Sequence, residues 1–140
     1  EELQRFRLKK ILDKKPVCFN HNLETVERLQ REVRRGANYN SSINLLKMAK
    51  NIYPNIETKS GIMIGLGENL EEIKHTILDL KKVKCNQITI GQYLRPSLNH
   101  LPVKKYWEPE EFEYIEKFSK QLGFNKVSCG PLIRSSYHAG

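Results

Sequence analysis

Four short clusters hold the side chains of this sequence that could bind or transform a ligand. Amides beside a carboxylate can jointly hydrogen-bond the neighbouring hydroxyl groups of a sugar, or bind an amine. Glycine turns allow a ligand close to the backbone, and an arginine beside serines suits a carboxylate or a phosphate. The clusters are Asn20–Asn22 with Glu24, Gly65–Glu68, Gly91–Tyr93, and the closing Arg134, Ser135, Ser136, Tyr137 and His138.

A structural interpretation of each cluster stands beside the functional one. Asn22 could cap a following helix, with Glu24 favoured by the positive end of the helix dipole. The three glycines within residues 61–67 could serve tight packing of a strand against a helix. Polar residues near a chain end, such as those from Arg134 onward, are often exposed and without function. The residues alone leave both interpretations open.

The elements that must position these clusters alternate between strands and helices. Apolar runs predict strands at 16–20, from 59 to the glycine turn, at 87–93 and at 125–129. Apolar residues at helical spacing predict the intervening helices. Two of these helices span 3–13 and 23–33. A third follows an N-cap at Ser41, and a fourth follows a capping box made by Asn69 and Glu72. The fifth runs from Pro109 to a C-cap at Gly123.

This order predicts an α/β fold with a parallel sheet, because strands that alternate with amphipathic helices form βαβ units. In such folds ligands bind beyond the carboxyl ends of the strands. Each of the four predicted strands runs into one of these clusters, the last of them through Gly130. We therefore expect all four to lie at the same end of one sheet.

Length and composition restrict the class of protein. The 140 residues suffice for one compact domain but not for a complete eight-stranded β/α barrel, which takes roughly 200–250 residues. The net charge of +8 comes from 24 basic residues mixed with 16 acidic ones, as in the pairs Glu24/Arg28 and Glu27/Arg31. The basic residues form no stripe interleaved with aromatics, so we expect no nucleic-acid partner. No apolar run approaches a membrane span, and we expect no membrane partner.

Cysteines and histidines show no metal-binding pattern. Cys18, Cys85 and Cys129 lie far apart, which indicates neither a disulfide framework nor a zinc site but small residues of a reducing compartment. The four histidines also lack metal-ligand spacing. The serines lack the strand–turn–helix setting of a hydrolase nucleophile.

Five segments resemble one family in order and spacing. They are FNHNLETV, GANYNSSINLLK, TKSGIMIGLGE, TIGQYLRPSLNHLPVKKY and GFNKVSCGPLIRSSYHA, and together they cover essentially residues 5–140. They resemble the C-terminal half of lipoyl synthases, which are radical S-adenosylmethionine (SAM) enzymes. NHNLET with GIMIGLGE would also fit biotin synthases, whereas GQYLRPS and the RSSYHA ending favour lipoyl synthases. The resemblance implies the C-terminal portion of a partial β/α barrel of the TIM type, over 1–140, with an auxiliary-cluster segment at about 130–140.

The resemblance also implies a reaction, cofactors and partners. Enzymes of this family use one 4Fe-4S cluster to cleave SAM, and the resulting radical abstracts hydrogen from two carbons of an octanoyl chain. A second, auxiliary 4Fe-4S cluster is sacrificed to supply two sulfur atoms. The octanoyl chain is carried on a lysine of lipoyl carrier domains, in E2 subunits of 2-oxoacid dehydrogenases and in the glycine cleavage H protein. Ferredoxin or flavodoxin is the implied electron donor, and a bacterial cytoplasm or an organelle matrix the implied compartment.

Site residues follow from the resemblance position by position. Asn20, Asn22 and Glu24 match the motif that contacts the ribose and methionyl parts of SAM. Residues matching the adenine-supporting motif are Gly61, Met63, Gly65 and Glu68, with Leu94 as a further adenine candidate. Ser136 matches a hydroxyl ligand of the auxiliary cluster, and Arg134 an arginine beside that cluster, which makes these two the expected catalytic residues.

One departure from the family pattern is large. The cysteine motifs of both clusters belong to the N-terminal half of the family and are not present in these 140 residues. We therefore expect this chain to be inactive alone. A non-catalytic, basic α/β module that binds phosphates or acidic carrier domains, and a biotin-synthase-like enzyme, are the alternatives.

Overall fold

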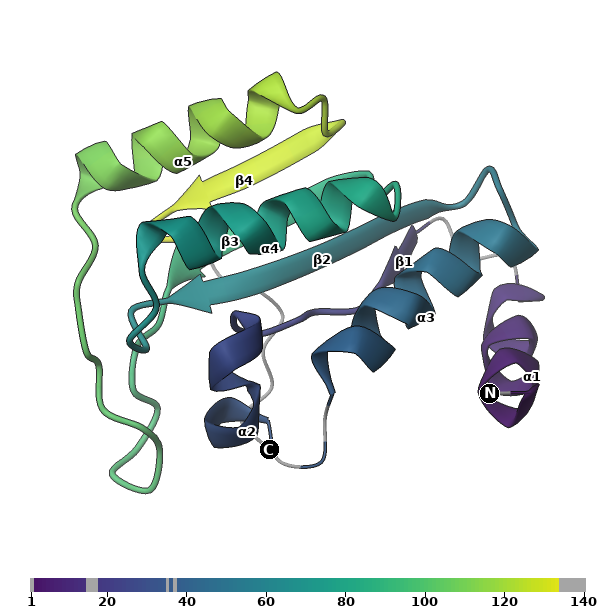
Figure 1. Ribbon diagram of the computed structural model, residues 1–140, viewed down its shortest axis with the longest axis horizontal. Helices are drawn as coiled ribbons and strands as arrows, with labels where there is room; N and C mark the ends of the chain where they lie inside the picture. The colour runs from purple at the N-terminus through teal and green to yellow at the C-terminus, as the bar shows by residue number, and fades with distance from the viewer. Residues whose placement is uncertain (1, 15–17, 35, 37, 134–140) are drawn as a thin grey trace.

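The computed structural model describes residues 2–14, 18–34, 36 and 38–133. Within them, four strands form one parallel sheet in the order β1-β2-β3-β4 (Figure 1). The strands are β1 (Cys18–Asn20), β2 (Glu57–Ile64), β3 (Gln87–Gln92) and β4 (Lys126–Gly130). The predicted parallel α/β architecture is confirmed, and it is consistent with part of a TIM-type barrel.

Helices alternate with the strands, as their apolar spacing predicted. They are α1 (Glu2–Leu12), the 3-10 turn η1 (Glu27–Leu29), α2 (Gln30–Val33), α3 (Tyr39–Ile52), α4 (Leu70–Lys82) and α5 (Pro109–Gln121). The three longest, α3, α4 and α5, pack on one face of the sheet (Figure 1). The main core forms there, with Leu46, Ile73 and Ile115 from the helices against isoleucines of β2 and β3. None of the helices within the described residues is long and apolar enough to cross a bilayer.

The other face of the sheet, called the inner face below, is turned away from α3, α4 and α5. Side chains alternate between the two faces along a strand, so residues two apart share a face. Because the strands are in register, inward residues lie in rows across the sheet. From the amino to the carboxyl ends of the strands, these rows are Asn20, Lys59, Gln87 and Lys126; then Gly61, Thr89 and Ser128; then Met63, Gly91 and Gly130.

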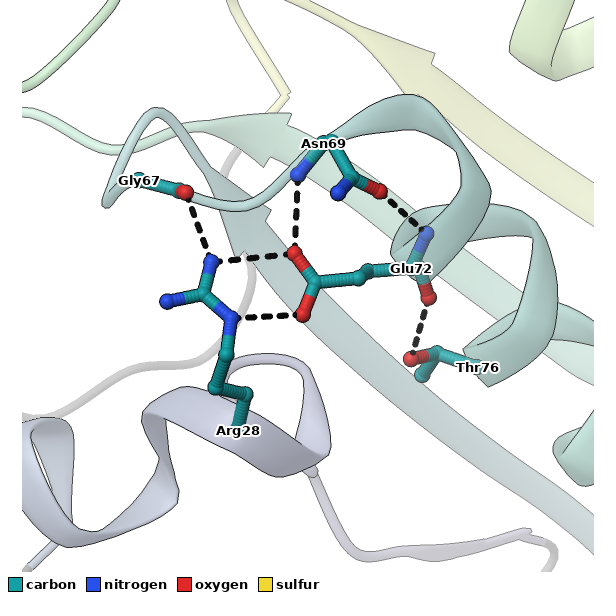
Figure 2. Close-up of polar contacts among 5 residues, drawn as sticks. All are labelled: Arg28, Gly67, Asn69, Glu72 and Thr76. Carbon is teal, nitrogen blue, oxygen red and sulfur yellow. Dashed lines mark hydrogen bonds and ion pairs between the residues drawn. The ribbon is translucent and has the colours of Figure 1, made fainter.

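The capping box predicted at the start of α4 is confirmed. Asn69 Oδ1 accepts from the backbone N–H of Glu72 at 2.9 Å, and Glu72 accepts from the backbone N–H of Asn69 at 3.0 Å. Arg28 binds the same carboxylate through two nitrogens, at 2.8 and 3.0 Å, and also donates to the carbonyl of Gly67 (Figure 2). Arg28 thus joins η1 to α4 rather than pairing with Glu24 along one helix.

The prediction of one continuous helix over 23–33 is wrong. The N–H of Glu24 donates to the carbonyl of Gly61 at 3.1 Å, and the carbonyl of Glu24 accepts from Met63 at 2.9 Å. These bonds prolong the pairing with β2, so helical structure begins only at η1. Three of the four apolar residues that suggested the helix are buried all the same. Asn22 consequently caps no helix.

The start of α3 also differs from the prediction. The N-cap is Asn38, whose side-chain oxygen accepts from the backbone N–H of Ser41 at 3.1 Å. Asn38 has an extended backbone, which places its oxygen over the first turn, as an N-cap requires. Ser41, which we predicted as the N-cap, therefore lies within the first turn of α3, three residues after Asn38.

Candidate functional site

Backbone bonds between the β1 segment and β2 assemble the first part of the candidate site. The N–H groups of Leu23 and Glu24 both donate to the carbonyl of Gly61, and Met63 donates to Glu24. Glu24 has a φ of 71°, in the left-handed region that a non-glycine residue seldom adopts. Such backbone conformations concentrate at ligand sites. The structure thus brings Glu24 beside Gly61 and Met63, which the resemblance assigns to different parts of the same cofactor.

Side chains from the segment after β1 and from β3 converge above Gly61 on the inner face. A Cβ atom placed on Gly61 would lie 2.1 Å from Thr89 Oγ1 and 3.3 Å from Asn22 Oδ1. Any residue larger than glycine at position 61 would therefore displace the Thr89 hydroxyl. Gly61 brings an amide and a hydroxyl together at the point that the sequence predicted for a cofactor.

The residues above Gly61 fit a ligand that offers hydroxyl groups. Thr89 is 5% exposed, and its Oγ1 has no hydrogen-bond partner among the described residues. A buried hydroxyl without a partner costs about 1–3 kcal/mol. An amide and a hydroxyl are groups that hydrogen-bond the hydroxyls of a ribose, so these residue types suit the sugar of a nucleoside cofactor such as SAM.

Gly65 and Glu68 belong to a second structure, a clamp in the loop between β2 and α4. Glu68 is 6% exposed, and its carboxylate accepts from the N–H groups of Gly65 (2.8 Å) and Leu66 (3.0 Å) and from Trp107 Nε1 (2.9 Å). A Cβ on Gly65 would lie 2.3 Å from Gln92 Nε2. The space beside Gly65 is filled by the protein itself, so both residues shape the loop from within.

The remaining predicted residues lie in different surroundings. Asn20 is exposed at the end of β1. Met63 is 8% exposed and packs with Val26 and Tyr93 in a small second core at the carboxyl ends of the strands. Leu94 follows β3 and is 62% exposed. Arg134 and Ser136 lie outside the described residues.

A group of polar side chains ties the end of β1 to α3. His21 Nε2 lies 3.0 Å from Ser42 Oγ, and Arg34 donates to the carbonyl of Leu23 at 2.9 Å. Burial lowers the pKa of His21 below its ordinary value of 6.5, and the nearby charge of Arg34 lowers this pKa further. His21 is therefore neutral at pH 7 and acts as a structural link.

Two of the three cysteines donate hydrogen bonds to backbone carbonyls. Cys129 Sγ donates to the carbonyl of Phe112 on the helix-covered side of the sheet, and Cys85 Sγ donates to the carbonyl of Gln87. Burial raises the pKa of Cys85 to about 11 and that of Cys129 to about 12, which disfavours thiolates. Across the part of the chain that the structure describes, no three His, Cys, Asp or Glu side chains are grouped to hold a metal.

A large surface groove lies elsewhere, beside η1 and α4. It measures about 950 Å³ and is bordered by Arg28, Glu72, His75 and Phe118. Arg28 and Glu72, both on its border, form the ion pair drawn in Figure 2. Among the described residues, no predicted site residue lines this groove, and none of its lining residues carries a buried polar atom without a partner. The inner face remains the better candidate because its polar side chains converge there.

Comparison with known proteins decides the family. A model of the radical SAM superfamily matches residues 4–80, more than half of the chain. The chain belongs to the radical SAM superfamily. In this radical SAM chain the matched residues include β1, β2 and the Asn22–Glu24 and Gly61–Met63 segments described above. SAM and an iron–sulfur cluster are the cofactors that this family implies.

Curated relatives confirm the resemblance to lipoyl synthases. Lipoyl synthase 2 of Prochlorococcus marinus subsp. pastoris is 75% identical over 140 residues, which are 100% of this chain and 47% of that protein. Lipoyl synthase 2 of Nostoc sp. is 53% identical over 140 residues, with the same coverage. The lipoyl synthase of Histophilus somni is 53% identical over 132 residues, 94% of this chain and 41% of that protein. The chain spans about half the length of the curated relatives it matches.

Thr89 and Trp107 are the site residues that sequence reasoning missed. Thr89 had a usable signal, because Gln87, Thr89 and Gly91 alternate with two isoleucines and so belong to the non-core face. Trp107 had none, since its bond to Glu68 spans 39 residues and no local pattern predicts it.

Proposed function

We propose that this chain is the C-terminal half of a lipoyl synthase, which inserts two sulfur atoms into an octanoyl chain carried on a lysine of a lipoyl domain. The observation that carries this proposal is the 75% identity, along all 140 residues, to a lipoyl synthase. The inner-face geometry supports it, because polar side chains meet above Gly61 where a SAM ribose is expected. The basic binding module accounts for neither observation.

In this proposal the chain supplies one wall of the SAM site. Asn22 and Thr89 hydrogen-bond ribose hydroxyls, and the Glu24 carboxylate accepts a further hydrogen bond from the ribose. Gly61 and Met63 present backbone and apolar surface to the adenine. When bound, SAM and two 4Fe-4S clusters supply the radical chemistry and the sulfur, while the protein positions the reacting groups and excludes water.

The C-terminal residues and the partners complete the proposal. Ser136 ligates the auxiliary cluster, Arg134 lies beside it, and residues 130–140 form the auxiliary-cluster segment. Octanoylated domains of E2 subunits and of the glycine cleavage H protein are the substrates, and ferredoxin or flavodoxin donates electrons. The compartment is a bacterial cytoplasm or an organelle matrix, where the three free thiols stay reduced.

The test uses the complete protein from the source gene, with its clusters reconstituted under anaerobic conditions. Both cysteine motifs should precede Glu1 in that gene, and mass spectrometry should show two sulfur atoms added to an octanoylated carrier domain. Glu24→Gln keeps the size of the side chain at a left-handed position and removes its charge. Loss of one hydrogen bond to a charged group, about 1.5 kcal/mol, should weaken SAM binding roughly tenfold in a calorimetric titration.

The matched control is Glu113→Gln, on the exposed side of α5. It makes the same chemical change far from the inner face and should leave SAM affinity unaltered. An unchanged affinity in Glu24→Gln would remove the ribose role of Glu24. Absence of both cysteine motifs upstream, or no sulfur insertion by the complete protein, would overturn the proposed function as a whole.

A further inference from the structure

Two glycines side by side on β3 and β4 leave a notch in the inner face. Gly91 and Gly130 are partners in the strand register, and neither has a side chain to fill the space above the sheet. After β4 the chain turns, and the N–H of Ile133 donates to the carbonyl of Gly130 at 3.2 Å. This turn brings the chain back over the sheet that it has just left.

The backbone of Ile133 occupies this notch. A Cβ placed on Gly91 would lie 2.1 Å from the carbonyl oxygen of Ile133 and 3.1 Å from its carbonyl carbon. Because both are backbone atoms, they cannot rotate away as the end of a side chain could. The returning chain therefore lies directly on the glycine of β3.

The two glycines differ in what a methyl group would meet. At Gly130 the nearest atom to an added Cβ is Ile133 Cγ1 at 3.8 Å, an ordinary van der Waals contact with a movable side chain. At Gly91 the same methyl group would overlap a carbonyl oxygen. Gly91 and Gly130 thus form a matched pair, in which one substitution lifts Ile133 off the sheet and the other leaves it in place.

We propose that Gly91 is a positioning residue that seats Ile133 and thereby fixes the point, at the carboxyl ends of the strands, from which the C-terminal segment continues. Met63 is the partner of Gly91 in the register of β2 and β3, so the seat lies beside a residue assigned to the cofactor. Three residues of extended chain span at most about 11 Å, which bounds the distance from Ile133 to Ser136. The functional part of this inference rests on the proposed function, since it takes Arg134 and Ser136 to act at that place.

The first test measures how firmly Ile133 is held in the 140-residue chain. Trypsin can cut after Arg134, and cleavage requires the residues around the cut bond to leave any fixed conformation. Gly91→Ala should accelerate this cleavage at least tenfold, read by mass spectrometry as loss of residues 135–140. Gly130→Ala should stay within twofold of the unsubstituted chain. Equal rates for all three chains would overturn the proposal.

A second measurement covers the case in which Gly91→Ala unfolds the chain. Urea unfolding is compared for four proteins: the unsubstituted and the Gly91→Ala sequence, each as the intact chain and as a chain ending at Leu132. Without Ile133 the overlapping oxygen is gone, so the substitution should lower the urea midpoint of the intact chain only. Such coupling between two changes identifies contacting groups. An equal loss in both lengths, including a failure of both to fold, would show a merely local strand defect and refute the seat.

The third measurement asks whether the seat serves the site. In the complete, cluster-reconstituted protein, Gly91→Ala should keep SAM affinity within twofold while losing iron and the spectroscopic signal of the auxiliary cluster. Retention of that signal would confine Gly91 to a structural role. If the unsubstituted complete protein binds no SAM, the proposed function fails, whereas proteolysis and urea unfolding still decide whether Gly91 seats Ile133.

Discussion

Replacing Glu68 tests whether the loop after β2 is held by a buried carboxylate. Three donors point at this carboxylate, the backbone N–H groups of Gly65 and Leu66 and the indole of Trp107, at 2.8–3.0 Å. Glu68 and Trp107 are 6% exposed, so solvent has little access to these bonds. Glu68→Ala would leave all three donors buried without an acceptor.

The size of the effect follows from the number of bonds. Each donor left unsatisfied costs about 1–3 kcal/mol, and partial relaxation with entry of water reduces the sum to about 3–5 kcal/mol. Glu68→Gln keeps one acceptor oxygen but turns an NH2 group toward a donor, so about 1–2 kcal/mol is expected. Trp107→Phe removes one donor, and its effect should shrink in the Glu68→Ala background because the bond is already lost.

The assay is urea unfolding followed by the fluorescence of Trp107, the single tryptophan of the chain, with circular dichroism as the probe for Trp107→Phe. With an unfolding slope of roughly 2 kcal/mol/M, Glu68→Ala should lower the midpoint by about 2 M. Glu113→Gln, on the exposed side of α5, should leave the midpoint unchanged. A cost below about 1 kcal/mol for Glu68→Ala, or strict additivity with Trp107→Phe, would refute the clamp.

Two further predictions concern stability. The pKa of His21 is lowered in the folded state, so as the pH falls below 6.5 the unfolded chain binds a proton before the folded chain does. The free energy of unfolding should therefore decrease between pH 6.5 and the lower pKa of the folded state. His21→Gln should flatten this part of a profile of stability against pH. A profile unchanged by the substitution would contradict the burial of a neutral imidazole. Asn69→Ala removes the N-cap of α4 and should lower the free energy of unfolding by about 1 kcal/mol in thermal or urea unfolding. The control Asn40→Ala, on the exposed side of α3, should lower it by less than half of that. Equal losses would show that Asn69 does not stabilise α4 as a cap.

Local signals predicted most of the fold. The capping box of Asn69 and Glu72, the proline that opens α5 and the apolar runs of β2 and β3 each depend on neighbours within a few residues. In such features the interacting residues lie close together in the sequence, so a local pattern can predict them. The parallel order then follows from the alternation of strands and helices, and with it the common position of the three clusters that lie within the described residues.

Contacts between distant segments account for what could not be predicted. The apolar spacing over 23–33 is helical, yet the carbonyl of Gly61 binds the N–H of Glu24 and holds this part of the segment against β2. From the sequence, the glycines could serve either the close approach of a ligand or the tight packing of the chain. At Gly61, Gly65 and Gly91 the space is taken by Thr89, Gln92 and Ile133, partners from 27 to 42 residues away in the chain, as the residue numbers show.

The seat on β3 also has a consequence for how the chain is made. Synthesis proceeds from the amino end, so β3 and its notch at Gly91 leave the ribosome well before the residue that fills the notch. A chain released at Leu132 would keep all four strands and the main core, because no residue after Leu132 belongs to either among those described. Quality control that senses an exposed core would not distinguish it from the intact chain. Completion of this end of the sheet therefore waits until the four strands have been made, and release at Leu132 would yield a folded sheet without the residue that fills the notch.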